Sequence, residues 1–311
     1  MSEESVIRTK SLTRYFGAKP AVYELNLEVP RGSVFAFVGR NGSGKSTTIR
    51  MLLGLLKPTR GNATVLGCDS ASLTPRARER IGYLTEEHQL YGWMSVRESG
   101  EFQSRFYPRW NEKIFQSVID HFGLKPAARV KDLSRGERAG LALGLTLAPD
   151  PELLILDDPS LGLDPVARRA LVESMIYLTR SSDRTIFFST HQLSDLERLA
   201  DYVAILDRSV LRACCPLDAF RENVKQARLT FAGSPPRIQD IPGVLQVFRA
   251  SQELRVVCVH YDAKLEQALN ALSPLSLEVC PVSLEDALVS YLGEHGEKSF
   301  ILAETETETR P

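Results

Sequence analysis

The sequence predicts an α/β fold with a mainly parallel sheet, followed by a smaller α+β domain. Short apolar runs alternate with helical patterns along the first part of the chain, and this alternation is typical of a parallel sheet covered by helices. Beyond about residue 223 the pattern changes to short β-rich runs with few helices. The length of 311 residues is enough for roughly two domains.

The predicted strands of the first domain are short. In Tyr23–Val29 the residues Leu25, Leu27 and Val29 alternate with polar residues, which is typical of a half-buried strand. The other strand candidates are apolar runs, which are Ser33–Val38, Arg80–Leu84, Leu153–Leu156, Thr185–Ser189 and Val203–Leu206.

Helical patterns fill the intervals between these strands. One begins at Lys45 and carries apolar residues as far as Leu56, and another spans 165–180 with a proline in its first turn. No strand pattern occurs between residues 96 and 148, so we predict a helical insertion made of Val96–Phe106, Glu112–Phe122 and Gly136–Ala148. We assign residues 1–222 to the first domain, with a helical subdomain over about 92–148.

The second domain is predicted over residues 223–295. Its elements are strands Arg228–Phe231, Val244–Arg249, Leu254–Val259 and Leu277–Val279, and helices Ala263–Leu272 and Leu284–Leu292. The remaining residues, 296–311, alternate Thr and Glu at low complexity, and we expect a disordered tail there.

Composition limits the classes of function. Lys plus Arg number 38 and Asp plus Glu 39, giving a formal net charge of −1, so no nucleic-acid partner is expected. No apolar run approaches the roughly 18 residues needed to span a bilayer, and the acidic start does not resemble a signal peptide. The five cysteines form no C-x-x-C pair, which favours free thiols in a reducing compartment. We therefore expect a soluble, cytoplasmic protein.

A glycine-rich loop carries the strongest chemical signal. The run GRNGSGKST fits G-x-x-x-x-G-K-[ST] between a predicted strand and a predicted helix. Its backbone N–H groups can surround phosphate oxygens, the lysine can reach the β- and γ-phosphates, and the following serine can ligate Mg²⁺. The predicted nucleotide-binding residues here are Gly39, Asn41, Gly42, Ser43, Gly44, Lys45, Ser46 and Thr47.

A second motif follows the apolar run Leu153–Leu156, which ends in Asp157 and Asp158. A buried strand that delivers a carboxylate to its C-terminal end is what a Mg²⁺ site beside such a loop requires. The two motifs together predict a nucleoside triphosphate site with Ser46 and Asp157 on the metal.

Together with shorter motifs, these residues resemble the nucleotide-binding subunit of ATP-binding-cassette (ABC) transporters over about residues 5–220. Residues 133–137 (LSRGE) resemble the family signature LSGGQ, and residues 161–164 (LGLD) resemble its D-loop. His191 resembles the switch histidine, and Glu86 stands where the Q-loop normally has Gln. Phe16, with Tyr15 as the alternative, lies where the family stacks an aromatic ring on adenine.

The resemblance implies a mechanism in which two cassettes sandwich two ATP molecules. Each ATP would lie on one subunit's loop and be closed by Ser134 and Gly136 of the other subunit. Asp164 would link the two sites, and His191 would contact the γ-phosphate. Asp158 would be the general base or would position the water, and Glu86 would lie near Mg²⁺. The expected cofactors are ATP and Mg²⁺.

Several positions depart from the family pattern. Asp158 replaces the usual Glu, and the side chain, shorter by about 1.5 Å, either slows hydrolysis or serves as an equivalent base. Arg135 replaces a signature glycine and is either a cation beside the partner's phosphates or a solvated side chain. Tyr91, Trp93 and Phe102 fit either a docking surface for a permease or the core of the helical subdomain.

These features predict an ATP-binding and ATP-hydrolysing subunit that powers a separately encoded membrane permease, an exporter. Its expected partners are a second copy or a paralogous cassette and the permease, which would hold it at the cytoplasmic face of the membrane. The alternatives are a soluble ABC ATPase that transports nothing, such as a scaffold, and a nucleotide-dependent switch with weak hydrolysis.

Overall fold

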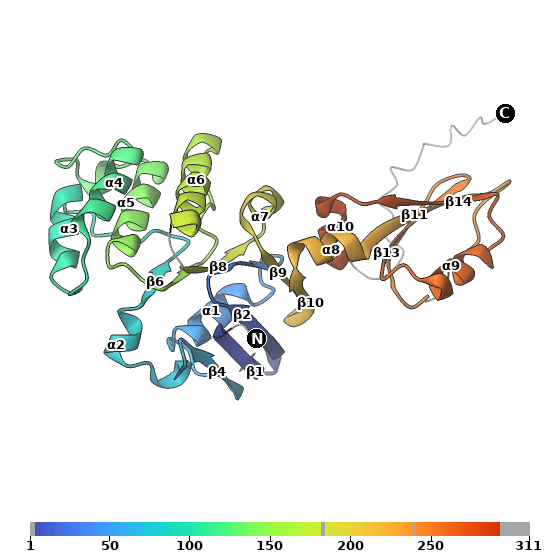
Figure 1. The fold of residues 1–311 in the computed structure, drawn as a ribbon, viewed down its shortest axis with the longest axis horizontal. Coiled ribbons are helices and arrows are strands. Elements are labelled where there is room, and N and C mark those ends of the chain that lie inside the picture. The colour runs from blue at the N-terminus through green and yellow to red at the C-terminus, as the bar shows by residue number, and fades with distance from the viewer. Residues whose placement is uncertain (1–3, 182–183, 239–240, 293–311) are drawn as a thin grey trace, which may run out of the picture. The chain divides into compact units, whose positions relative to one another are not determined.

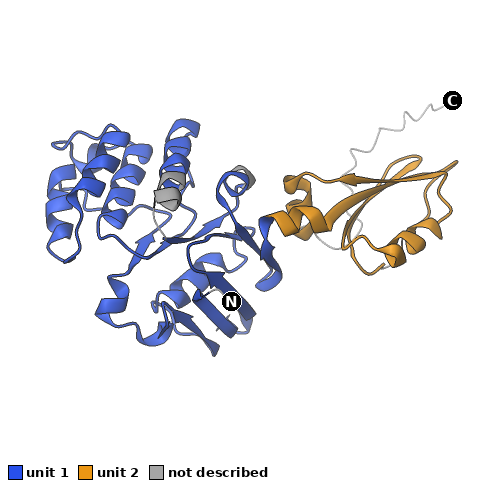
Figure 2. Cartoon of the chain, in the orientation of Figure 1, with its two compact units in different colours: residues 1–217 blue, residues 218–311 orange. Residues whose placement is uncertain are grey.

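A computed structural model describes residues 4–181, 184–238 and 241–292. The chain divides into two compact units, residues 1–217 and residues 218–311 (Figure 2), whereas the sequence pattern predicts the boundary after residue 222. The predicted tail over 296–311 lies outside the described residues. Among the described residues, no helix combines the length and the apolar character needed to cross a membrane.

The central sheet of the first unit has six strands in the order β10-β9-β3-β8-β7-β6. The pairs β3–β8, β3–β9, β7–β8 and β6–β7 are parallel, and β10 pairs antiparallel with β9. Every residue of β3, β7 and β8 is buried, as expected for parallel strands covered on both faces. The strands are β3 (Val34–Val38), β6 (Ile81–Leu84), β7 (Leu153–Leu156), β8 (Thr185–Thr190), β9 (Tyr202–Asp207) and β10 (Val210–Pro216).

A second, antiparallel sheet has the order β2-β1-β4-β5. Leu25, Leu27 and Val29 of β2 are buried, as their alternation predicts, and they join Phe35 and Phe37 of β3 in one core. The strands are β1 (Ser5–Phe16), β2 (Lys19–Pro30), β4 (Arg60–Val65) and β5 (Cys68–Asp69).

The helix after β3 is shorter than predicted. Helix α1 spans Lys45–Leu52 and ends before the predicted limit at Leu56. Gly54 has φ +69°, and the carbonyl of Ser70 occupies the space that a side chain would need, so the chain turns away there. The other helical segments of this unit are η1 (Ser70–Ser72), α2 (Pro75–Arg78), η2 (Val130–Asp132), α6 (Pro165–Ser181) and α7 (Leu193–Leu199).

The predicted helical insertion consists of α3 (Val96–Ser104), α4 (Glu112–His121) and α5 (Arg135–Leu147), which gather at one end of the unit (Figure 1). It has its own hydrophobic core, formed by Val96, Phe115, Ile119, Leu141 and Leu145 with their neighbours. The capping boxes Ser95–Glu98 and Ser134–Glu137 begin α3 and α5.

The second unit contains a four-stranded antiparallel sheet in the order β12-β13-β11-β14. Leu265 and Leu269 of α9 pack on Leu229, Leu254 and Val256 of the sheet. The elements are α8 (Leu217–Asn223), β11 (Val224–Thr230), β12 (Val244–Arg249), β13 (Glu253–Val259), α9 (Ala263–Asn270), β14 (Ser276–Pro281) and α10 (Leu284–Leu292). All five cysteines of the chain are unpaired.

Candidate functional site

The glycine-rich loop connects the end of β3 to the start of α1. Gly42 and Gly44 have φ +79° and +113°, conformations that residues with a side chain rarely adopt. A Cβ at Gly39 would meet the carbonyl of Leu206, and one at Gly44 would meet the carbonyl of Ala21. These positions therefore require glycine, and the loop closes tightly around the N-terminus of α1.

Lys45 and Ser43 supply hydrogen-bond donors inside this loop. The Lys45 ammonium is buried, donates to the Gly39 carbonyl at 2.9 Å and lies 3.4 Å from Oδ2 of Asp158. The Ser43 hydroxyl is buried without a partner among the described residues. A phosphate group would give both side chains an acceptor, so the loop fits a nucleotide. Asn41 and Gly42 are exposed on the outer turn, and Thr47 is half-buried in α1.

Ser46 and Asp157 provide oxygen ligands at the C-terminal edge of the central sheet. The Ser46 hydroxyl donates to Oδ1 of Asp157 at 3.1 Å, and the Ser189 hydroxyl donates to the same oxygen at 2.8 Å. Mg²⁺ takes few protein ligands and keeps waters and phosphate oxygens in its shell, so this donor set fits Mg²⁺. Glu86 is exposed after β6 and, within the part of the chain that the structure describes, makes no hydrogen bond to Ser46 or Asp157, so the structure does not bring it into the metal site.

Asp158 is held in a constrained position next to Asp157. Its φ is +43°, it is 7% exposed, and its backbone N–H donates to the Ser189 hydroxyl at 2.8 Å. Its carboxylate contacts two basic groups, with Nδ1 of His191 3.0 Å from Oδ1 and the Lys45 ammonium near Oδ2. The structure therefore joins the loop lysine, the second aspartate and the histidine in one chain of contacts.

Phe16 lies at the tip of the β1–β2 hairpin. It is exposed, pairs with Lys19 across the turn, and has the Arg14 guanidinium 4.9 Å from its ring centroid. Because β2 also carries Ala21, whose carbonyl lies against Gly44, this hairpin lies beside the glycine-rich loop. The Phe16 ring is exposed with Arg14 over one face, whereas Tyr15 is half-buried.

The LSRGE segment packs against the LGLD segment of the same chain. Ser134 caps α5 and is exposed, and a Cβ at Gly136 would lie 2.6 Å from that of Ala167. The Arg135 guanidinium lies over Gly162 and has no acidic partner in the described part of the chain. Asp164 is exposed and accepts the N–H groups of Val166 and Ala167, which caps α6.

One buried polar residue near the site, His88, was not predicted from the sequence. His88 is 6% exposed with φ +46°, and its ring bonds to the carbonyl of Pro159, the residue after Asp158. Burial lowers the pKa of His88, and its Nε2 has no hydrogen-bond partner among the described residues. One signal was available, because a histidine directly after the Q-loop segment is close in sequence to a predicted site residue.

The structure distinguishes between the two interpretations of the aromatic residues after β6, which are a docking surface and the core of the helical subdomain. Four aromatic side chains are exposed, and Trp93 is the most exposed of them at 66%. Their rings form a row of contacts in the order Trp93, Tyr91, Phe102 and Phe106. They are therefore not part of the core of the helical subdomain. We call these four residues the aromatic surface.

Comparisons with known proteins agree with this geometry. The family model described as ABC transporter matches residues 22–161. The bacitracin transport ATP-binding protein BcrA of Bacillus licheniformis is 34% identical over 220 residues, which cover 70% of this chain and 72% of that protein. The Nod factor export ATP-binding protein I of Neorhizobium galegae is 31% identical over 301 residues, 94% of this chain and 86% of that protein.

A solved structure shares the fold of the first unit. The dimeric structure of MJ0796, a bacterial ABC transporter cassette, is 21% identical with a TM-score of 0.61, over 68% of this chain and 98% of that chain. The motif order, the site geometry and these relatives agree. The chain belongs to the ABC transporter family, among its ATP-binding subunits.

Proposed function

We propose that this chain hydrolyses ATP to drive a separate membrane permease, and that the permease exports its substrate. The observation that carries the proposal is the contact chain from Lys45 through Asp158 to His191, set beside the Ser46–Asp157 pair. Together these residues combine donors that can bind phosphate, a pair of oxygen ligands suited to Mg²⁺ and a carboxylate that can act as a base.

Each side chain then has a role in hydrolysis. Lys45 exchanges the Gly39 carbonyl and Asp158 for phosphate oxygens when a nucleotide binds. That exchange frees the Asp158 carboxylate to orient a water molecule and accept its proton, while His191 stays within reach of the γ-phosphate. Ser46 and Asp157 would hold Mg²⁺, which supplies neutralising charge on the phosphates. Phe16 would stack on the base.

A second cassette completes the site in this proposal. Ser134 is exposed and Arg135 has no acidic partner in the described part of the chain, so both are available to a second molecule. The existence of a dimeric structure for a cassette of the same fold supports this arrangement. In this arrangement Arg135 would add positive charge beside the partner's phosphates.

The aromatic surface is the proposed contact with the permease. Aromatic residues are enriched at protein interfaces, and in this chain four of them adjoin the segment that follows β6 and Glu86. The names of the two relatives, which refer to bacitracin transport and Nod factor export, support export. The permease would place the chain at the cytoplasmic face of the membrane.

A nucleotide-dependent switch with weak hydrolysis is the second candidate, and the short Asp158 side chain favours it. Its carboxylate is engaged by Lys45 and His191 and must be released before it can meet a water molecule. Asp158→Glu separates the two functions. A severalfold higher turnover would indicate that Asp limits the rate, and an unchanged or lower turnover would indicate that Asp is an adequate base.

The direct test is steady-state Mg-ATP hydrolysis by the purified chain. We expect phosphate release that is abolished in Lys45→Ala and strongly reduced in Asp157→Asn. Arg105→Gln, an exposed position away from the loop, serves as the matched control and should behave like wild type. Hydrolysis that persists in Lys45→Ala would overturn the proposed site.

A further inference from the structure

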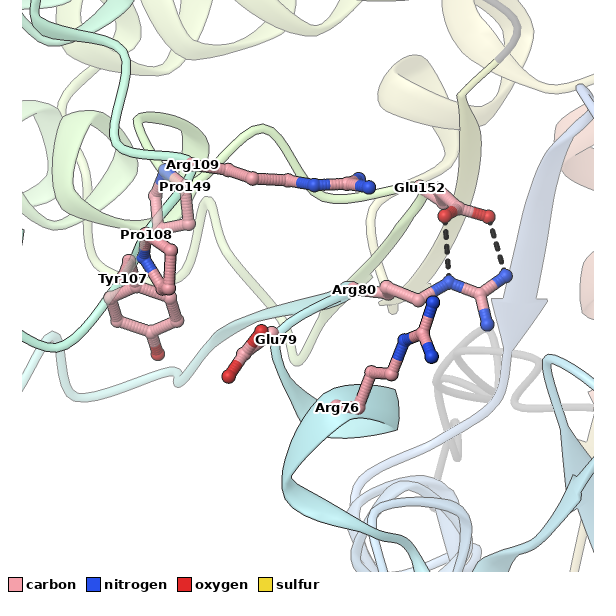
Figure 3. A pocket seen from close by; sticks show the side chains of 8 residues that line it. All are labelled: Arg76, Glu79, Arg80, Tyr107, Pro108, Arg109, Pro149 and Glu152. Carbon is pink, nitrogen blue, oxygen red and sulfur yellow. Dashed lines mark hydrogen bonds and ion pairs between the residues drawn. The ribbon is translucent and has the colours of Figure 1, made fainter.

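A cavity of about 350 Å³ lies in the first unit, away from the nucleotide site. Its walls come from the end of α2, from the connection between α3 and α4, and from the residues before β7. Figure 3 shows the side chains that carry its chemistry, which are Arg76, Glu79, Arg80, Tyr107, Arg109 and Glu152. A volume of this size accommodates a small organic molecule.

The cavity lies at the opposite edge of the central sheet from the nucleotide site. Arg80 and Glu152 directly precede the parallel strands β6 and β7, whereas Asp157 directly follows β7. Parallel strands share their N-terminal edge, so the four-residue length of these strands, roughly 13 Å, separates the two sites. One ligand therefore cannot bind both sites through the same phosphate group.

One part of the cavity carries an excess of positive charge. Arg80 donates two hydrogen bonds to Glu152, at 2.6 and 2.7 Å, so that pair is neutral. Arg109 also lowers the pKa of Glu152, after the larger effect of the Arg80 hydrogen bond. Arg76 and Arg109 themselves have no acidic partner within 4 Å among the described residues. In Figure 3 both extend toward the Arg80–Glu152 pair.

The remaining lining does not cancel this charge. Glu79 points in Figure 3 toward the side of the cavity where Tyr107 lies, away from the guanidinium groups. Tyr107 and the neighbouring rings of Pro108 and Pro149 form a less polar wall. The cavity thus presents two unpaired guanidinium groups on one side and an aromatic ring with two prolines on the other.

We propose that this cavity is a binding site for a small organic molecule that carries a phosphate group. Arg76 and Arg109 would bind the phosphate, because guanidinium groups match phosphate oxygens in geometry and charge. Tyr107 and the prolines would pack on the organic part. The site is distinct from the glycine-rich loop, and its occupant would join the α3–α4 connection to the strands of the sheet.

The test counts binding sites by isothermal titration with pyrophosphate, without Mg²⁺, at about 150 mM KCl to screen diffuse charge. Wild type should bind at two sites, Lys45→Ala at the cavity alone, and Arg76→Gln/Arg109→Gln at the glycine-rich loop alone. The triple variant should bind at least tenfold more weakly at every site. Arg105→Gln, on the same connection but outside the cavity, should match wild type.

A second titration tests the organic part in the Lys45→Ala background. Phenyl phosphate should bind severalfold more tightly than inorganic phosphate, and Tyr107→Ala should remove that difference. The proposal is overturned if Lys45→Ala abolishes pyrophosphate binding, or if the cavity variants keep both sites. Thermal unfolding of the Arg76→Gln/Arg109→Gln variant should match that of wild type, because both side chains are exposed, and this shows that loss of binding is not loss of folding.

Discussion

Removing the Asp158 carboxylate while keeping its shape tests the contact between this residue and Lys45. In Asp158→Asn the Lys45 ammonium, which is 5% exposed, keeps its hydrogen bond to the Gly39 carbonyl and loses the acidic partner that it has in the described structure. Unit charges 3.4 Å apart attract by about 5 kcal/mol at an effective dielectric constant of about 20. The cost of removing both charged groups from water offsets part of this attraction. Leaving one buried charge without its partner costs about 3–5 kcal/mol. Because the loop can open to water, we expect a loss of about 2–4 kcal/mol in the free energy of unfolding.

The assay is urea denaturation of wild type and Asp158→Asn, with and without saturating Mg-ADP. The nucleotide gives Lys45 new acceptors, so the difference between the two proteins should shrink to about 1 kcal/mol or less when it is bound. Asp132→Asn, an exposed aspartate without an ion pair, is the control and should stay within about 0.5 kcal/mol of wild type. If nucleotide-free Asp158→Asn is as stable as wild type, the ion pair does not hold the empty loop and the reasoning fails.

Further predictions concern the far edge of the sheet, the aromatic surface and the missed histidine. The Arg80 hydrogen bond lowers the pKa of Glu152 below its usual 4.5, so Arg80→Met should cost about 1 kcal/mol at pH 7. This loss of unfolding free energy should vanish as the pH falls through the lowered pKa of Glu152. A loss that does not depend on pH in urea titrations would contradict the prediction. Trp93→Ala should change the unfolding free energy by less than about 0.5 kcal/mol while reducing recovery of the chain with membranes, and unchanged recovery would argue against a docking role. His88→Leu should lower kcat about tenfold with little change in KM for ATP, because it releases Pro159 next to Asp158, whereas His88→Gln should retain more activity. Equal kcat in all three proteins would show that His88 has no positioning role.

Local patterns were sufficient for most elements that position the site. The run Leu153–Leu156 is a strand with the predicted limits, and Val34–Val38 and Ile81–Leu84 lie within one residue of theirs. Such buried parallel strands consist of consecutive apolar residues, which makes them easy to recognise. The loop motif likewise predicts the start of α1, because Lys45, the first residue after its glycines, is the first residue of the helix.

Strands with irregular pairing could not be predicted. The strand β1 pairs with β2 through several register shifts, and Ser11 within it has φ +45°. These irregularities interrupt the alternation of buried and exposed residues, so no period appears in the sequence. The strand β10 was not predicted either, because its pairing with β9 shifts between Leu211 and Ala213 and its inward-facing residues are short and only half-buried.

The contacts between side chains of the site could not be predicted from the sequence. The motifs predict Lys45, Asp158 and His191 as site residues, but the contacts among them depend on the order of β3, β7 and β8 in the sheet. The bond from His88 to Pro159 likewise joins segments that are distant in the sequence. The expectation for Glu86 came from a motif position alone, and among the described residues no contact with Ser46 or Asp157 supports it.

The central claim is that ATP hydrolysis requires two copies of this chain, and the dependence of the rate on protein concentration tests it most directly. The Mg-ATPase rate should rise more steeply than linearly at low concentration and become proportional to concentration once dimers predominate. Mixing wild type with excess Lys45→Ala, whose own loop is inactive but whose Ser134 is intact, should alter the rate per wild-type chain. A rate strictly proportional to concentration throughout, and insensitive to the added variant, would show that one chain suffices and would contradict the account.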